Sequence, residues 1–181
     1  MSTIKVSTIS PLGTDATNTI TLGTNGTDTV TGAGSMVPAF EAKLTSDQAI
    51  SDNTLTKIGF NSVELDTDSK YSTSDYRFTP TISGKYFVYS QVNGFAGGDS
   101  DLVTITLQIR KNGSVVRFSF VEPSNNFGKT HTLNCSSILT LDSDDYVEIF
   151  ASIDGNSGGG EVIQGTSNSA TFFGAYKVIG A

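Results

Sequence analysis

Apolar and polar residues alternate along much of the chain beyond residue 100. In the stretch "DLVTITLQIR", residues 101–110, Val, Leu or Ile alternates with Thr, Gln or Arg. A period of two places the two sets on opposite faces of a strand, whereas a helix would mix them. The pattern therefore predicts a strand with one buried face, which carries Val103, Ile105, Leu107 and Ile109.

A tight turn follows this strand at Asn112-Gly113, and "VVRFSFV", residues 115–121, returns from it. Asn-Gly tolerates the positive φ values of a two-residue hairpin turn. Other strand candidates are "THTLNCSSILTL" (130–141), "DYVEIFAS" (145–152) and "ATFFGAYKVI" (170–179), and no window of ten or more residues has a helical stripe. Many short strands separated by turns predict an all-β sandwich or jelly roll.

The first 36 residues differ from the rest of the chain. They are rich in Thr and Gly, and every Phe and Tyr of the protein lies at Phe40 or beyond. A segment of this composition cannot bury a core of its own. Ile20 and Leu22 alternate with Thr before Asn25-Gly26, which indicates a short hairpin or extended arm. We therefore expect residues 1–36 to form an N-terminal arm that docks on a larger body, and residues 37–181 to form one β domain.

Aromatic residues concentrate between positions 60 and 90, and their spacing is specific. Phe60, Asp66, Tyr71, Phe78, Gly84 and Tyr86 occur in that order, the last two separated by one residue. This set resembles the signature of the complement C1q globular domain, a jelly roll of the tumour necrosis factor (TNF) superfamily. Two positions depart from it, because Val88 stands where the family usually has Phe and Ser90 where it has Phe or Tyr.

The resemblance implies a ten-strand jelly roll of the C1q/TNF-like type over residues 37–181. It also implies a homotrimer packed around an axis of aromatic and apolar side chains. The run Tyr86-Phe87-Val88-Tyr89 fits this, because a strand with that sequence is apolar on both faces. The residues we assign to core or trimer packing are Phe60, Tyr71, Phe78, Gly84, Tyr86 and Val88.

Charge and composition exclude several classes of partner. The formal net charge is −7 and the Lys and Arg residues never cluster, so a nucleic-acid surface is not expected. No apolar run approaches the ~18 residues of a membrane span. The opening residues lack the apolar core of a secretory signal, so we expect the protein to be made and assembled in the cytoplasm, without Sec export.

Candidate catalytic chemistry is sparse. His131 and Cys135 lie four positions apart in one predicted strand, about 13 Å from each other, which is too far for a nucleophile and its base. We expect Cys135 to be buried and His131 to lie on a surface or interface. The protein is therefore not expected to be an enzyme, and an enzyme that degrades polysaccharide is the weakest alternative.

Two acidic loops raise the question of a metal. Asp99 and Asp101 form one, and Asp142, Asp144 and Asp145 form the other. Calcium favours several oxygens converging from a flexible loop, but Asp-Ser-Asp-Asp is also an ordinary turn whose side chains bond their own backbone. We expect no cofactor, with bound calcium as the alternative. Recognition is expected on loops, and the loops we select are Gly94–Asp101, Pro123–Lys129 and Asp154–Gly160.

The N-terminal sequence carries a second resemblance. "MSTIKVSTISPLGTD" and "ITLGTNGTDTVTGAG" are similar to the opening of small virion and tail-fibre proteins of bacteriophages, particularly cyanophages. This implies a structural protein on the virion surface, docked through residues 1–36 to a capsid or tail protein. It would act as capsid decoration or cement, or as a short head or tail fibre that binds a host surface glycan or protein. The alternative is a free carbohydrate- or protein-binding module of the lectin or adhesin type.

Overall fold

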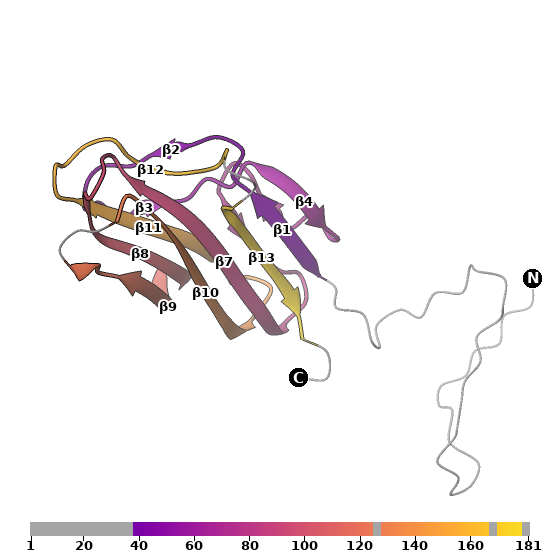
Figure 1. Ribbon diagram of the computed structural model, residues 1–181. Coiled ribbons are helices and arrows are strands. Elements are labelled where there is room, and N and C mark those ends of the chain that lie inside the picture. Colours follow the sequence, from indigo (N-terminus) through magenta and orange to yellow (C-terminus); the bar gives the residue numbers. More distant parts are fainter. Residues whose placement is uncertain (1–37, 125–127, 167–169, 179–181) are drawn as a thin grey trace, which may run out of the picture. The chain divides into compact units, whose positions relative to one another are not determined.

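The described residues form a two-layered β-sandwich (Figure 1). The computed structural model describes residues 38–124, 128–166 and 170–178. The first layer, the β7 sheet, contains β1 (Ala39–Lys43), β2 (Gln48–Ala49), β4 (Ser62–Asp66), β7 (Gly84–Ala96), β10 (Thr130–Leu141), β12 (Glu161–Ile163) and β13 (Phe172–Lys177). The second layer, the β8 sheet, contains β3 (Thr56–Lys57), β5 (Tyr71–Ser72), β6 (Arg77–Phe78), β8 (Leu102–Lys111), β9 (Ser114–Val121) and β11 (Val147–Gly155).

All strand pairs that define the two layers are antiparallel. In the β7 sheet, β4, β1, β13 and β7 follow one another, and β10 pairs along the whole other side of β7. In the β8 sheet the order is β5, β6, β11, β8 and β9. Strands β9 and β10 approach each other at the open side of the sandwich, where Arg117 Nη2 lies 3.5 Å from Ser137 Oγ. The antiparallel pairing of strands that are distant in the sequence, in two layers, confirms the predicted all-β jelly-roll class.

The strand count differs from the expected ten. The described residues contain thirteen strand segments, and β2, β3, β5, β6 and β12 are only two or three residues long. Four of these five lie between residues 48 and 78, where Ser, Asp, Asn and Thr interrupt every apolar run. Such residues bond their own backbone in turns, which breaks the ladder into short pieces.

Most of the predicted strand pattern is present, with one correction. Asn112 and Gly113 have φ values of 50° and 77°, as the Asn-Gly turn requires, and β10 has the predicted bounds. Ile105, Leu107 and Ile109 are fully buried, but Val103 is only half-buried. Leu102 is buried in its place, because the register between β8 and β11 shifts between Asp154 and Gly155.

The core is organised around a stack of aromatic rings between the two layers. Phe40 of β1 stacks on Phe78 and on Tyr71, with ring centroids 4.4 and 5.1 Å apart, and meets Phe173 edge-on at 4.8 Å. Strands from both sheets contribute to this stack, so it joins the layers directly. Stacked and edge-on aromatic pairs each add about 0.5–1.5 kcal/mol beyond the burial of their area.

The buried tyrosines of the core have partners for their hydroxyl groups. Tyr71 donates to the carbonyl oxygen of Phe60 at 2.9 Å, and Tyr86 donates to that of Ile82 at 2.5 Å. Burial, followed by the charge of Asp68, raises the pKa of Tyr86 to about 12. Both side chains therefore remain neutral hydrogen-bond donors over the physiological range.

The second acidic loop is a self-bonded turn. The carboxylate of Asp145 accepts hydrogen bonds from the Asp142 backbone N–H and from Asn112 Nδ2, both at 2.7 Å, and Lys111 Nζ lies 2.7 Å from it. Lys111 first, and then the Asp142 N–H, lower the pKa of Asp145 to about 2. The turn interpretation of this sequence is confirmed, and the loop is fixed to the β8–β9 hairpin.

The predicted N-terminal arm, residues 1–36, lies outside the described residues, and its docking role stays a prediction. Within the described ranges, the structure has no helix of the length and apolarity that crossing a membrane requires.

Removing the central ring of the core should destabilise the domain strongly. We expect Phe40→Ala to lower the free energy of unfolding by about 3–5 kcal/mol, because the ring is buried and its neighbours cannot fill the space. Ile82→Ala is the control, since the Ile82 side chain is 43% exposed, and it should cost under about 1 kcal/mol. Denaturant unfolding at one fixed protein concentration measures both values. Equal losses in the two variants would contradict the proposed role of the stack.

The Asp145 turn should make stability depend on pH in acid. The folded-state pKa of Asp145 lies below its ordinary value of 3.8. The stabilisation of the fold by its ionised carboxylate is therefore complete above pH 3.8 and is lost as the pH falls through about 2. We expect Asp145→Asn to cost about 1–2 kcal/mol at neutral pH and progressively less below pH 4. Thermal melts across this range measure the difference. The exposed Asp75→Asn serves as control and should change stability little at any pH, whereas an Asp145→Asn deficit that stays constant with pH would refute the linkage.

Candidate functional site

The central strand β7 is apolar on both of its faces. Tyr86 and Val88 point into the sandwich and are fully buried, whereas the alternate residues Phe87 and Tyr89 point away from it and are half-buried. The adjacent strand β13 adds two aromatic side chains to the same outer face. Together these side chains form what we call the face cluster, which consists of Phe87, Tyr89, Phe172 and Tyr176.

Strand register brings the face cluster together. Tyr176 pairs directly with Phe87 across β7 and β13, with ring centroids 5.4 Å apart. Tyr89 lies between Phe87, Phe172 and Tyr176, at centroid distances of 5.9, 6.2 and 6.4 Å. The four rings are thus a continuous aromatic surface made by residues more than eighty positions apart in the chain.

Tyr89 is held in one orientation at the centre of this surface. Its ring lies over Gly174, where a Cβ would come within 2.4 Å of the ring carbon Cζ. Its hydroxyl donates a hydrogen bond to Glu41 Oε2 at 2.8 Å. Burial first, and then the bond to Glu41, raise the pKa of the Tyr89 hydroxyl well above its ordinary value. A side chain fixed in this way is prepared to contact another molecule with little loss of conformational entropy.

A shallow hollow adjoins the face cluster where β7, β10 and β13 meet. It has a volume of ≈ 360 Å³ and is lined by Phe87, Tyr89, Ser90, Asn134, Cys135, Ser136 and Phe172. Burial raises the pKa of the Cys135 thiol, so this group is a neutral apolar part of the wall rather than a nucleophile. The hollow is of a size to receive one or a few side chains of a partner.

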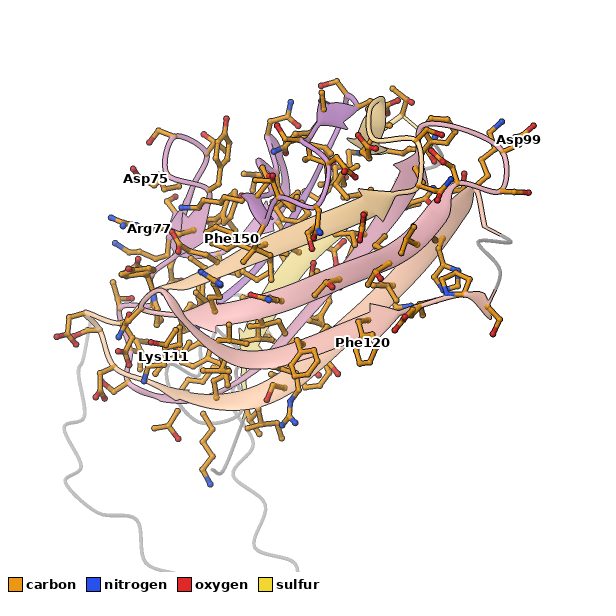
Figure 2. The ribbon with its side chains drawn as sticks, turned by 90° about the vertical axis from the view of Figure 1, so that its left-hand side faces the viewer. Asp75, Arg77, Asp99, Lys111, Phe120 and Phe150 are labelled. Carbon is orange, nitrogen blue, oxygen red and sulfur yellow. The ribbon has the colours of Figure 1, made fainter. Side chains whose placement is uncertain are left out.

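A second apolar surface lies at the open side of the sandwich. Phe118 and Phe120 of β9 are 57% and 55% exposed, and their rings stack with centroids 6.0 Å apart. We call these two residues the edge pair. Figure 2 shows Phe120 projecting from β9 at the margin of the β8 sheet. On the neighbouring strand β10, Ile138 is 60% exposed and pairs with Phe87, so it extends the face cluster toward this edge.

The residues assigned to packing from the sequence lie inside the domain. Phe60, Phe78, Tyr86 and Val88 are fully buried, Tyr71 is nearly so, and Gly84 begins β7. They form the core of one chain and do not reach the outer face. The two-sided apolar pattern of β7 predicted the outer face. The edge pair, Phe172 and Tyr176 were not predicted, although "VVRFSFV" and "FFGAYK" also place aromatic residues on both faces of a strand.

His131 and Cys135 both lie on β10, where they pair with Gly94 and Ser90 of β7. His131 is half-buried and Cys135 is buried. Four strand positions separate them, as the sequence predicted, so their side chains do not form a dyad. Within residues 38–124, 128–166 and 170–178, no group of three or more His, Cys, Asp or Glu side chains is arranged to hold a metal.

The three loops expected to carry recognition meet at one end of the sandwich. Gly128 O accepts a hydrogen bond from Asp101 N at 3.0 Å, and Asp101 Oδ1 accepts one from Ser157 N at 2.8 Å. Asp99 lies at this end and Lys111 at the other (Figure 2). Asp99 forms an exposed ion pair with Lys129 at 2.6 Å, whereas Asp101 is buried. Residues 125–127 of the second loop lie outside the described ranges.

Comparison with solved structures of murine APRIL shows the same architecture. The structure of murine APRIL at pH 5.0 is 13% identical with a TM-score of 0.56, and that at pH 8.5 is 14% identical with the same TM-score; each match covers 77% of this chain and 98% of the other. The globular domain of zebrafish complement 1qA protein is 16% identical with a TM-score of 0.49, over 78% of this chain and 97% of that one. No curated protein sequence matches significantly.

The family model of the C1q domain matches residues 39–176, which is most of the chain. The match runs from the first strand, β1, into the last, β13, and so includes both sheets. C1q domains are generally non-enzymatic binding modules, and domains of the C1q/TNF type typically form homotrimers. The aromatic signature, the two-sheet topology and the family match agree: this chain belongs to the C1q domain family.

Proposed function

We propose that the protein is a non-enzymatic binding module that works as a homotrimer. The observation that carries this proposal is the presence of two outward-facing apolar surfaces, the half-buried face cluster on the β7 sheet and the exposed edge pair on β9. Exposed aromatic patches of this kind mark surfaces that contact other proteins.

The position of the two surfaces favours a cyclic assembly, in which the chains form a closed ring. A two-fold dimer buries the same patch of both copies, whereas a ring joins one patch of each copy to a different patch of the next. The face cluster lies on the broad side of the sandwich and the edge pair at its margin. The edge of one copy would pack on the face of the next, and three such contacts close the ring.

The residues around the face cluster suit the rim of a protein interface. Glu41 bonds Tyr89, and Lys43 forms a 2.7 Å ion pair with Glu64 beside it. Lys85, on the outer face at the start of β7, is exposed. An aromatic centre surrounded by charged residues is the usual composition of a stable interface.

A trimer of this form leaves the loop end of each copy for recognition. The loops that contain Asp101, Gly128 and Ser157 are joined to one another by hydrogen bonds and are carried on a rigid sandwich. Three copies on one assembly raise the effective concentration of binding sites for a repeated ligand. A host surface glycan or protein is the class of ligand we propose.

The location we propose is the surface of a phage particle. This part of the proposal rests on the resemblance of the N-terminal sequence alone. Residues 1–36 would dock to a capsid or tail protein, and the trimer would act as capsid decoration or cement, or as a short head or tail fibre. A free module of the lectin or adhesin type is the alternative, and it would use the same trimer and the same loops.

Charge placed on either apolar surface should dissociate the trimer. We expect the wild-type protein to have the mass of three chains at micromolar concentration, and both Phe87→Lys and the double variant Phe118→Lys/Phe120→Lys to have the mass of one. Ile82→Lys is the matched control, because it adds the same charge at an exposed residue outside both surfaces and should remain trimeric. Light scattering and sedimentation measure the masses, and circular dichroism checks that each variant is folded.

Mixing the two dissociated variants tests the edge-to-face geometry. Each retains the surface that the other lacks, so an equimolar mixture should form one-to-one pairs and no trimers. A face-to-face dimer would instead survive the substitutions on β9. A wild-type protein that remains a single chain at micromolar concentration would overturn the trimer proposal.

Removal of the N-terminal segment should separate assembly from location. We expect a chain that starts at Val37 to form trimers as the full chain does, but to be missing from particles purified after infection. Mass spectrometry of the particles measures incorporation, and the full chain produced in the same way is the control. Detection of the full chain outside infected cells rather than in particles would favour the free binding module.

A further inference from the structure

A hollow smaller than the one beside the face cluster shares no lining residue with either apolar surface or with the three loops expected to carry recognition. It has a volume of ≈ 270 Å³ and is lined mainly by Ser46, Asp47, Gln48, Gly59, Asn61 and Tyr76. These residues come from the segment between β1 and β4 and from the β5–β6 hairpin. The volume is near the lower end of the ~300–1,000 Å³ usual for small-ligand pockets, so the hollow suits a molecule of one ring.

Tyr76, which lines this hollow, has a backbone conformation that a bulky residue rarely adopts. It is the residue before β6, and its φ is 51°. The other non-glycine residues with positive φ in the described ranges all have small polar side chains, and they are Asn53, Ser69, Ser100 and Asn112. Steric contacts of the side chain with the backbone disfavour a bulky ring in this region. A strained position of this kind indicates that the ring has a use beyond the turn.

The ring of Tyr76 lies over Gly59, which has no side chain to displace it. A Cβ at position 59 would come within 3.1 Å of the ring carbon Cζ and 3.2 Å of Cε2. Gly59 is itself held in place, because its backbone N–H donates to Gln48 Oε1 at 2.9 Å. The Tyr76 side chain is half-buried, so it is supported on Gly59 and still lines the hollow. It supplies an apolar ring with a hydroxyl at its end.

Two further polar side chains of the hollow are held through one oxygen each. Asp47 Oδ1 accepts hydrogen bonds from the backbone N–H of Gly165 at 2.9 Å and from the Thr166 hydroxyl at 3.0 Å. Asn61 Oδ1 accepts from the backbone N–H of Thr45 at 3.0 Å and from its hydroxyl at 3.1 Å. No hydrogen bond within the described ranges uses Asp47 Oδ2 or Asn61 Nδ2. One acceptor and one donor are therefore available to a ligand.

The charge of Asp47 limits the class of ligand. The hydrogen bond from Gly165 lowers the pKa of the Asp47 carboxyl below its ordinary value of 3.8, so this group is ionised at neutral pH. Among the residues that line the hollow, Asp47 is the charged one. Its charge repels a ligand that carries a carboxylate or a sulfate, whereas hydroxyl groups can donate to it in charge-assisted hydrogen bonds.

We propose that this hollow binds one neutral pyranose sugar. A pyranose has an apolar C–H face and a rim of hydroxyl groups. The C–H face would stack on Tyr76, while hydroxyl groups would donate to Asp47 Oδ2 and accept from Asn61 Nδ2. Because all three side chains are already held in place, binding orders little that is mobile in the protein. The site goes beyond the proposed function, since it requires neither the trimer nor the three loops, and all of its residues belong to one chain.

Ligand-observed NMR of the full-length protein tests the site. The probes are the methyl glycosides of D-glucose, D-mannose, D-galactose and N-acetyl-D-glucosamine. We expect saturation transfer from the protein to the ring C–H protons of at least one glycoside. Binding should be saturable, with a dissociation constant of the order of 1 mM, which is usual for a small ligand with one stacking contact and a few hydrogen bonds.

Three variants identify the residues responsible. Tyr76→Asn should weaken binding by about tenfold or more without lowering the melting temperature, because Asn tolerates the positive φ at this position. Asp47→Asn keeps the oxygen that accepts from Gly165 but removes the charge, and it should weaken binding to a similar extent. Asp75→Asn is the matched control, because Asp75 is the exposed neighbour of Tyr76 and does not line the hollow, and it should bind as the wild type does.

Either of two results would overturn the proposal. One is the absence of saturable binding of all four glycosides, including the case in which choline binds instead, since the hollow would then select a cation. The other is unchanged glycoside binding in both Tyr76→Asn and Asp47→Asn. A wild-type protein that is a single chain would refute the trimer but leave this test unaffected.

Discussion

The two-sided apolar character of β7 is the constraint on which the rest of the structure depends. Tyr86 and Val88 close the sandwich from one side, and Tyr86 contacts Phe78 of the aromatic stack that joins the two sheets. The alternate residues Phe87 and Tyr89 place aromatic area on the opposite side. A single sandwich buries only the first of these faces. The second face is therefore the strongest structural reason to consider this chain as part of an assembly.

The molecule divides its surfaces between different tasks. The broad side of the β7 sheet carries half-buried aromatic residues, the β9 margin carries exposed ones, and the loop end carries polar groups and the buried Asp101 and Glu161. Sheets are rigid and suit contacts that must repeat with the same geometry in each copy. Loops tolerate changes in sequence and suit contacts with a ligand. This division allows recognition to change without loss of assembly.

The two acidic loops show how similar sequences acquire different chemistry. In the loop 142–145, Asp145 finds Lys111, Asn112 and its own backbone, so its charge is compensated. In the loop 97–101, Asp101 is buried beside Glu161, sixty residues away in the chain, and one of its oxygens has no donor. Both loops contain closely spaced Asp residues, and only the surroundings decide that the carboxylate of Asp145 is fully compensated and that of Asp101 is not.

Local sequence was enough to predict the long strands β7 to β11 and β13, most of their inward and outward residues, the Asn-Gly turn and the family. These features depend on period-two alternation, on local backbone preferences and on a spacing signature, all of which act over short stretches of chain. The face cluster required the register between β7 and β13, and the approach of Asp101 to Glu161 required two connections, β7–β8 and β11–β12, to meet at one end. Val103 and Leu102 exchanged their expected roles for the same reason, a register shift against β11. Register and loop convergence arise from contacts between distant segments, so no local pattern specifies them.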